Sequence, residues 1–309
     1  MILVVHSTNP KTNAKKDSAM DKLLGARDAV AAIQDGMTVG IGGWGPRRKP
    51  MALVRELLRS DVKDLTIVSY GGADVGLLCA AGKVRKVIFA FVSLDFMPLE
   101  PAFRKARESG AVEVMEIDEG MMLLGLRAAA WGVPFIPTQV GLGTDVIKNN
   151  PELAVIDSPY DDKEWLAVPA LKLDVSLLHV SNASRRGVCE IASPDHYMDD
   201  WFARAAKHTI VSTDNVVGDE HFHDPNVARR VFWERAETQA VVHTTCGAHP
   251  SSNDPSHGFD VAHLKQYAQL ITEGGYSAWA ETFLGADEAE YLSAVGGVDA
   301  IHALPQPVY

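Results

Sequence analysis

The stretch Glu113–Val146, EVMEIDEGMMLLGLRAAAWGVPFIPTQVGLGTDV, decides the fold of this chain. Residues 112–117 alternate apolar and polar side chains as a strand does, and apolar residues then recur at helical spacing over residues 122–129. The pattern predicts a strand, an amphipathic helix, a second strand and a glycine-rich turn. The sequence Asp-Glu-Gly at residues 118–120 therefore falls at the corner between the first strand and the helix.

Glu119 is the candidate functional residue at this corner. In an α/β sheet, ligands bind outside the carboxyl ends of the strands, where such a corner lies. A carboxylate beside a helix N-terminus is also stabilised by the backbone N–H groups, by about 0.3–1 kcal/mol. Spacing alone therefore leaves two interpretations open: a reactive carboxylate at Glu119, or ordinary capping by Asp118 and Glu119.

Strands and helices alternate along the rest of the chain. In the first half, strands are predicted at residues 37–41, 64–70 and 84–92, with helices from Pro50 and over 101–108. The second half has predicted strands at 171–180, 210–217 and 241–244, and predicted helices at 195–208, 261–271, 277–284 and 288–295. A helix is also predicted over 21–35. Alternation at this spacing predicts an α/β fold with a largely parallel sheet and helices on both faces.

Composition indicates an ordinary globular protein of 309 residues, with 47% hydrophobic and 22% charged residues. We expect a flexible extension at residues 1–19 and one α/β domain over 20–309. The net charge of −11 argues against a nucleic-acid partner, which needs a basic face. No apolar run reaches membrane-spanning length, so no membrane partner is expected. Three distant cysteines predict no disulfide framework and favour the cytoplasm.

A second glycine-rich stretch, GIGGWGPRRKP, follows the strand at 37–41. Its G-x-G-x-x-G spacing is by itself a weak signal for dinucleotide binding, and here a Pro-Arg-Arg-Lys segment separates the last glycine from the helix. Arg47, Arg48 and Lys49 stand just ahead of that helix, where positive charge is unfavourable unless an anion is bound. They are candidate ligands of an anionic group, with a solvated loop as the alternative.

Other motifs do not indicate a metal or a serine hydrolase. His243-x-x-Cys246-x-x-His249 has no evident fourth ligand, and His221-x-His223-Asp224 lies in a polar loop, so no metal is expected. The G-x-S-x-G sequence of a serine nucleophile elbow is absent from the chain.

The two glycine-rich stretches together resemble the α subunits of family I CoA-transferases. In those subunits the first stretch has an acidic residue and a Q-G corner, followed by G-I-P-A-F and then by T-P-T-G-x-G-T. Ten residues of this chain fall on that pattern in order: Glu116, Gly120, Gly132, Pro134, Phe135, Pro137, Thr138, Gly141, Gly143 and Thr144. The second matches G-F-G-x-x-G-I-P-E-N-L at Gly43, Trp44, Gly45, Pro50 and Leu53. The resemblance implies the CoA-transferase family I fold and a β subunit of the same fold.

Three departures from the family pattern concern side chains that act in the transferases. Glu119 stands where those enzymes carry a donor glutamine, and Ala52 replaces an asparagine that polarises the acyl group. Arg48 replaces a glycine. The sequences around residues 40–52, Tyr70-Gly71-Gly72, 91–95 and 118–120 resemble instead the steroid ring-opening hydrolases that use the same fold.

This resemblance implies the α subunit of a heteromeric hydrolase, with two α and two β subunits. Its implied substrate is a cyclic β-diketone CoA thioester from rings C and D of a steroid such as cholesterol or a bile acid, opened by water-dependent carbon–carbon cleavage. Glu119 would be the general base. The turns Gly43-Trp44-Gly45 and Gly141–Thr144, the latter including Gly143, would contact the substrate through backbone N–H groups. CoA belongs to the substrate, so no separate cofactor is implied.

Two other functions remain open. The chain could be the α subunit of a CoA-transferase that moves CoA between carboxylic acids, with its nucleophilic glutamate on the β subunit. It could also be a non-catalytic CoA-binding protein of related fold.

Overall fold

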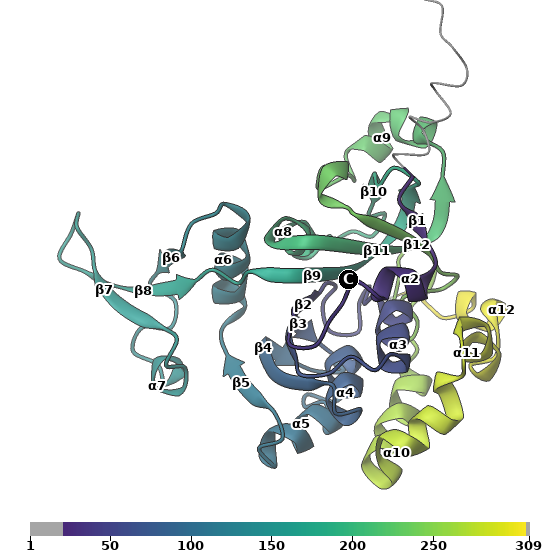
Figure 1. Ribbon diagram of the computed structural model, residues 1–309, viewed down its shortest axis with the longest axis horizontal. Coiled ribbons are helices and arrows are strands. Elements are labelled where there is room, and N and C mark those ends of the chain that lie inside the picture. The colour runs from purple at the N-terminus through teal and green to yellow at the C-terminus, as the bar shows by residue number, and fades with distance from the viewer. Residues whose placement is uncertain (1–20, 307–309) are drawn as a thin grey trace, which may run out of the picture.

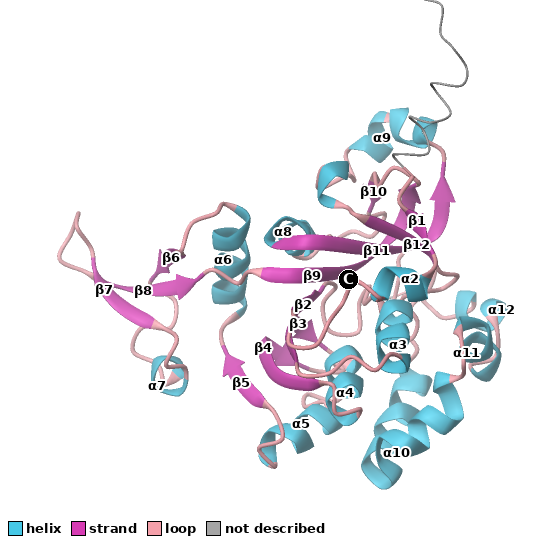
Figure 2. Cartoon of the chain, in the orientation of Figure 1, coloured by secondary structure: helices cyan, strands magenta, loops and turns pink. Residues whose placement is uncertain are grey.

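The computed structural model describes residues 21–306. In this part of the chain a nine-stranded sheet runs through the centre of the molecule (Figures 1 and 2). Its path is β1 (Leu23–Leu24), β12 (Ala240–His243), β11 (Ala206–Val217), β9 (Leu173–Ser184), β2 (Thr38–Ile41), β3 (Leu65–Gly71), β4 (Val84–Val92) and β5 (Glu113–Glu116), with β10 (Cys189–Glu190) beside β9. Neighbours on this path are parallel, and only β10 pairs antiparallel. The predicted parallel sheet is therefore confirmed.

Helices cover both faces of this sheet, as predicted. Adjacent residues of one strand enter different cores: Ile67 packs into the first and Val68 into the second. Side chains alternate across a strand, so the two cores lie on opposite faces. The first core holds α2 (Ala26–Val30), α3 (Met51–Arg59), α4 (Ala73–Ala80), α5 (Pro101–Glu108), α10 (Val261–Trp279) and α11 (Glu288–Ala294). The second holds α6 (Glu119–Ala130) and α8 (Asp199–Ala205).

Element boundaries differ from the prediction where backbone geometry intervenes. The helix predicted over 195–208 is only α8, because Tyr197 has a positive φ of 51° and the chain from Ala206 already pairs with β9. The helix predicted over 21–35 is shortened to α2, with β1 ahead of it. α10 contains a break at Gly275, whose φ of 71° and ψ of −165° are not helical, so the two helices predicted at 261–271 and 277–284 are separated there as expected. The second of them passes into a π-helical turn at Ala280–Leu284.

The strand after α6 is a larger difference. β6 (Phe135–Thr138) does not extend the main sheet; it pairs antiparallel with β8 (Glu164–Pro169), which pairs with β7 (Ala154–Asp157). This small sheet lies to one side of the molecule in Figure 1, beside α7 (Val146–Asn149). Pro137 has no N–H to donate, which suits the edge position of β6 and would interrupt a central strand.

The remaining short elements are α9 (Pro225–Ala228), α12 (Val298–His302) and 3-10 turns at Asp219–His223 and Arg235–Glu237. The predicted flexible extension at residues 1–19 lies outside the described residues. Between residues 21 and 306, no helix combines the length and the apolar character needed to cross a bilayer.

Candidate active site at the carboxyl edge of the sheet

Glu119 is the first residue of α6, directly after β5, as the sequence predicted. Asp118 provides the helix cap, since its Oδ1 accepts the N–H of Gly120 at 2.7 Å. The carboxylate of Glu119 is exposed and has no hydrogen-bond or ion-pair partner within residues 21–306. The capping interpretation therefore accounts for Asp118 and leaves the Glu119 carboxylate available for chemistry.

Tyr70 holds the main chain of this corner in place. Its hydroxyl donates to the backbone oxygen of Glu119 at 2.9 Å, across 49 residues of sequence. Burial, together with the negative charges of Glu119 and Asp118, raises the pKa of Tyr70 well above its usual range, so the hydroxyl remains a donor. In the sequence Tyr70 ends the strand predicted at 64–70 and begins the Tyr70-Gly71-Gly72 motif, and no local pattern indicated this contact.

The turn Gly43-Trp44-Gly45 follows β2, but its N–H groups are already used within the chain. They donate, in order, to Asp199 Oδ1 at 2.8 Å, to the Arg47 carbonyl at 2.9 Å and to the Tyr70 carbonyl at 3.1 Å. A donor that is satisfied internally cannot also hold a substrate oxyanion without breaking its bond. Within the described chain this turn therefore has no free backbone N–H group to offer, and its contact with a substrate stays a prediction.

Two of the three cations ahead of α3 have buried internal counter-ions. Arg48 Nη1 lies 2.7 Å from Asp199 Oδ2, with side chains 1% and 0% exposed. Lys49 Nζ lies 3.2 Å from Asp74 Oδ2, also 1% and 0% exposed, and donates to Ser69 Oγ at 2.8 Å. Burial lowers the pKa of Lys49, and Asp74 opposes that effect. The expectation that these two cations require an external anion does not hold.

Arg47 is the cation of this group that reaches the surface. Its Nη2 pairs with Asp95 at 2.6 Å and its guanidinium lies 5.2 Å from the Trp44 ring centre. Trp44 is half-buried, meets Phe91 edge-on at 4.8 Å and lies nearly parallel to Tyr197 at 6.3 Å. Aromatic side chains therefore pack against one another beside the carboxyl ends of β2 and β4.

The turn Gly141–Thr144 lies against the first turn of α6. A Cβ on Gly141 would come within 2.0 Å of Met121 Cε, two residues after Glu119. Thr144 Oγ1 donates to the Gly141 carbonyl at 2.8 Å. The N–H groups of Gly141 and Gly143 have no acceptor in the described chain, and Gly143 faces open space. This turn, unlike Gly43-Trp44-Gly45, retains free donors.

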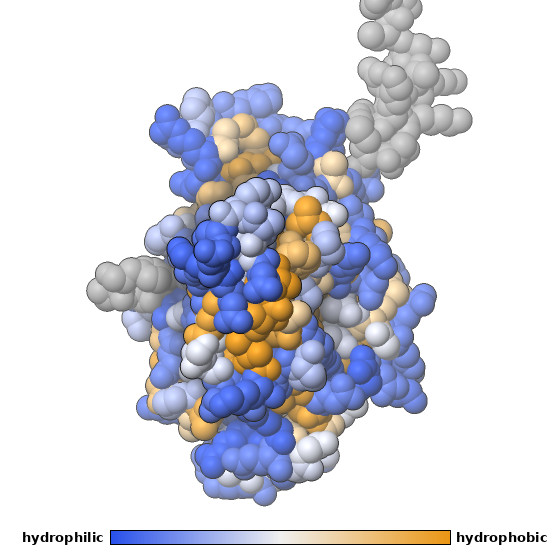
Figure 3. All heavy atoms as spheres, turned by 90° about the vertical axis from the view of Figure 1, so that its left-hand side faces the viewer, coloured by the Kyte–Doolittle hydropathy of each residue, from blue (hydrophilic) through white to orange (hydrophobic). Residues whose placement is uncertain are grey.

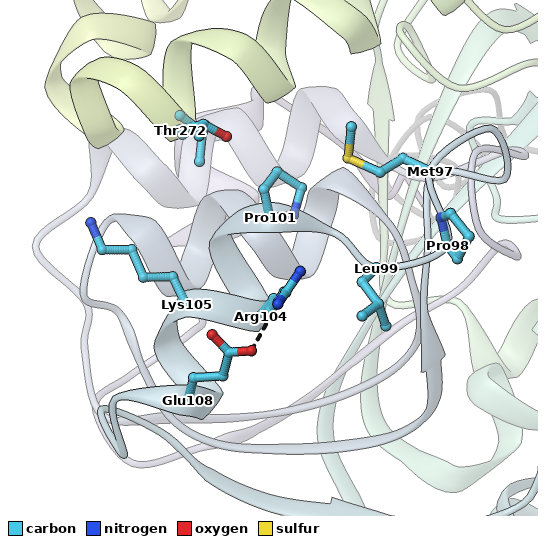
Figure 4. Close-up of a pocket in the computed structure, with 9 residues that line it drawn as sticks. Met97, Pro98, Leu99, Pro101, Arg104, Lys105, Glu108 and Thr272 are labelled. Atoms are coloured by element: carbon cyan, nitrogen blue, oxygen red, sulfur yellow. Dashed lines mark hydrogen bonds and ion pairs between the residues drawn. The ribbon is translucent and has the colours of Figure 1, made fainter.

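Two hollows elsewhere contain none of the candidate residues. A groove of about 530 Å³ lies between α5 and α10 and the loop before α5, where Met97, Leu99 and Lys105 are among its lining residues (Figure 4). A polar pocket of about 380 Å³ lies at the ends of β9 and β11 and includes Glu190 and Asp214. The groove of Figure 4 lies beside α5 and α10, which pack into the first core, whereas α6, which begins at Glu119, packs into the second.

A serine, a histidine and an aspartate near the polar pocket have the order of a hydrolase triad. His179 Nδ1 lies 2.9 Å from Ser212 Oγ, and its Nε2 lies 3.5 Å from Asp214 Oδ1. Burial by itself raises the pKa of the Asp214 carboxyl. His179 and the hydrogen bonds donated to that carboxyl outweigh burial and lower its pKa to about 2. Ser212 is 0% exposed, so its hydroxyl cannot reach a substrate and the group is structural.

The histidine and cysteine motifs do not converge on one point. His243 Nε2 lies near the Asp214 carbonyl, Cys246 Sγ near His302, and His249 Nδ1 near the Tyr291 hydroxyl. No group of three or more His, Cys, Asp or Glu residues between 21 and 306 is placed to hold a metal ion.

The family model for coenzyme A transferase matches residues 24–230 of the chain. The chain belongs to the coenzyme A transferase family. The transferase family fold predicted from the two glycine-rich stretches is thereby confirmed.

Relatives within the coenzyme A transferase family carry several activities in their names. The chain is 43% identical over 286 residues to the cholesterol ring-cleaving hydrolase IpdA subunit of Rhodococcus jostii (strain RHA1), covering 90% of this chain and 97% of that protein. Glutaconate coenzyme A-transferase from Acidaminococcus fermentans superimposes with a TM-score of 0.87 and 26% identity, over 92% and 95% of the two chains. A variant of the decarboxylase AibA/AibB has a TM-score of 0.76 and 27% identity, over 84% and 97%. Since these names cover hydrolysis, transfer and decarboxylation, the reaction has to be argued from the site.

Proposed function

We propose that this chain is the α subunit of a heteromeric hydrolase that opens a cyclic β-diketone CoA thioester derived from steroid rings C and D. The observation that carries the proposal is the free, exposed carboxylate of Glu119 at the strand-to-helix corner. The cholesterol ring-cleaving hydrolase IpdA subunit, at 43% identity, supports the same class of substrate. CoA is part of that substrate, and no separate cofactor is required.

Each step uses a group that the chain can supply. The Glu119 carboxylate accepts a proton from water, and the resulting hydroxide adds to one ring carbonyl of the diketone. The carbon–carbon bond then breaks, its electron pair passing to the enolate of the second carbonyl. The new carboxylic acid takes its added oxygen from water, and the protonated Glu119 returns its proton to the enolate carbon. The free N–H groups of Gly141 and Gly143 are suited to hold the developing oxyanion.

A β subunit of the same fold completes the proposed enzyme, in a heterotetramer of two α and two β subunits. Figure 3 shows a hydrophobic area, rimmed by hydrophilic residues, on the face that carries the small sheet. The segment from the end of α6 to the start of β8, which includes β6 and β7 of that sheet, has six large exposed apolar side chains: Trp131, Val133, Phe135, Val140, Val155 and Tyr160. Such a patch is typical of a protein–protein contact. Because Val140 adjoins Gly141, a partner on this face would also enclose the site beside Glu119.

The competing function is a CoA-transferase α subunit. A transferase requires a nucleophilic glutamate, which in this family resides on the β subunit, and a donor in place of Glu119.

The buried, unpaired cysteines Cys79, Cys189 and Cys246 agree with a reducing compartment, and a cytoplasmic location stays a prediction.

The test uses the chain purified with its β subunit and the CoA-linked cyclic diketone in oxygen-18 water. Glu119→Ala and Glu119→Gln should both lower the single-turnover rate by about 10²–10⁴-fold, because neither side chain accepts a proton. Asp118→Asn is the matched control, since asparagine caps a helix as well as aspartate does and only the neighbouring charge is removed. We expect its rate to stay within a few-fold of the native rate, with label in the new carboxylate.

Two results would contradict the proposal. One is a Glu119→Gln variant with a near-native rate. The other is transfer of CoA to an added carboxylic acid without uptake of label. Either would place the transferase function first and leave Glu119 as part of the helix start.

A further inference from the structure

Tyr70 connects the two glycine-rich parts of the site from the end of β3. Its hydroxyl donates to the Glu119 carbonyl at 2.9 Å, and its own carbonyl accepts the N–H of Gly45 at 3.1 Å. One residue therefore touches the corner after β5 with its side chain and the turn after β2 with its main chain.

The surroundings of Tyr70 keep its ring from moving. The residue is 0% exposed, meets Phe202 edge-on at 6.3 Å and lies tilted against Phe91 at 6.0 Å. Just beyond it, a Cβ on Gly72 would come within 2.8 Å of the Gly45 carbonyl oxygen, so the two backbones are in direct contact. The end of β3 is thus a packed platform from which a hydroxyl reaches the start of α6.

The first residue of a helix is positioned by contacts from outside the helix. The first N–H groups of a helix have no partner inside it, so the first residue is held only through its carbonyl and its cap. The cap of α6 is Asp118, which binds Gly120 and not Glu119. A carbonyl oxygen has two lone pairs, and the Glu119 carbonyl can accept the Tyr70 hydroxyl as well as an intrahelical N–H.

We propose that Tyr70 is a positioning residue, which fixes Glu119 relative to the turn Gly43-Trp44-Gly45 through the hydrogen bond between its hydroxyl and the Glu119 carbonyl. The proposal rests on the function proposed above, in which Glu119 is the general base. A phenylalanine would fill the same space and keep the platform packed, but it would release the first residue of α6. A displacement of about 1 Å at a catalytic group can lower a rate by as much as about 100-fold.

The experiment compares Tyr70→Phe with Tyr291→Phe in the α–β complex. Tyr291 is a matched control because it is also 0% exposed and its hydroxyl also makes a buried bond, to His249 Nδ1 at 2.7 Å, on a helix away from the site. Tyr70→Phe should lower kcat by about 10- to 100-fold while KM for the CoA thioester stays within twofold. Amide hydrogen exchange over residues 117–124 should become faster in Tyr70→Phe and remain native in Tyr291→Phe.

A double-mutant cycle separates positioning from a general structural defect. If Tyr70 acts through Glu119, adding Tyr70→Phe to Glu119→Gln should change the residual rate by less than twofold. An equal loss in both backgrounds, a kcat within twofold of native for Tyr70→Phe, or native exchange over residues 117–124 would overturn the proposal. A near-native Glu119→Gln rate would overturn the base function instead, and the exchange measurement would still decide whether Tyr70 holds the corner.

Discussion

Replacing Asp199 by alanine should destabilise the chain strongly, because this carboxylate neutralises a buried cation. Asp199 Oδ2 lies 2.7 Å from Arg48 Nη1, and its Oδ1 accepts the N–H of Gly43 at 2.8 Å. Both side chains of the ion pair are at most 1% exposed. Removing one partner of a buried pair leaves an uncompensated charge and costs about 3–5 kcal/mol. That is a large share of the roughly 5–15 kcal/mol by which domains are stable.

The assay is urea unfolding of the purified chain, and a surface ion pair of the same length is the control. Lys148 Nζ lies 2.7 Å from Asp145 Oδ1, but both side chains are 78% exposed. Solvent screening reduces such a pair to about 0–1 kcal/mol, so Asp145→Ala should scarcely move the midpoint. Asp199→Asn retains the shape and one acceptor oxygen, and we expect a smaller loss than for Asp199→Ala.

The expected loss of stability depends on burial, because the two ion pairs have the same N–O distance of 2.7 Å and differ in exposure. A loss below about 1 kcal/mol for Asp199→Ala, at an unchanged slope of free energy against urea, would mean that water reaches the Arg48 charge. Equal losses for Asp199→Ala and Asp145→Ala would mean that burial is not what distinguishes the two pairs.

Two further predictions concern a buried acid and a pair of glycines. Burial raises the pKa of Glu100 to about 7 from 4.5, so its neutral form contributes stability that is present below pH 4.5 and lost as pH rises through about 7. The unfolding free energy of the native chain relative to Glu100→Gln should therefore fall by about 2–3 kcal/mol from pH 5 to pH 8, and a difference independent of pH would contradict this. Gly43 and Gly143 both have positive φ, 74° and 76°, but a Cβ on Gly43 would lie 2.5 Å from the Arg47 carbonyl oxygen, whereas Gly143 has open space around it. Gly143→Ala should cost only the left-handed strain of about 1–2 kcal/mol and Gly43→Ala clearly more, and similar urea midpoints for the two variants would show that crowding is unimportant.

Much of the fold could be predicted because it depends on near neighbours in the sequence. β4 and α5 have the predicted bounds, since an apolar run and a proline at the first helical position are local signals. The corner at residues 118–120 follows from the change between strand and helix periodicity, and it placed Glu119 correctly. The small sheet could not be predicted in the same way. β7 and β8 were missed, and only their antiparallel pairing with each other and with β6 makes this segment a sheet.

At the candidate site, too, some features could be predicted from neighbouring residues and others depended on the tertiary structure. From the sequence alone, three cations ahead of α3 indicated that negative charge must lie close by, and that requirement was sound. Only the tertiary structure decided that the charges are internal, because Asp199 lies 151 residues beyond Arg48 and reaches it through the packing of α8 on the sheet. The hydroxyl of Tyr70 reaches Glu119 for the same reason, across 49 residues. Periodicity reports what a residue does within a few turns of its own helix or strand, whereas the partner of a buried charge or hydroxyl depends on which distant segments the parallel sheet brings to one edge.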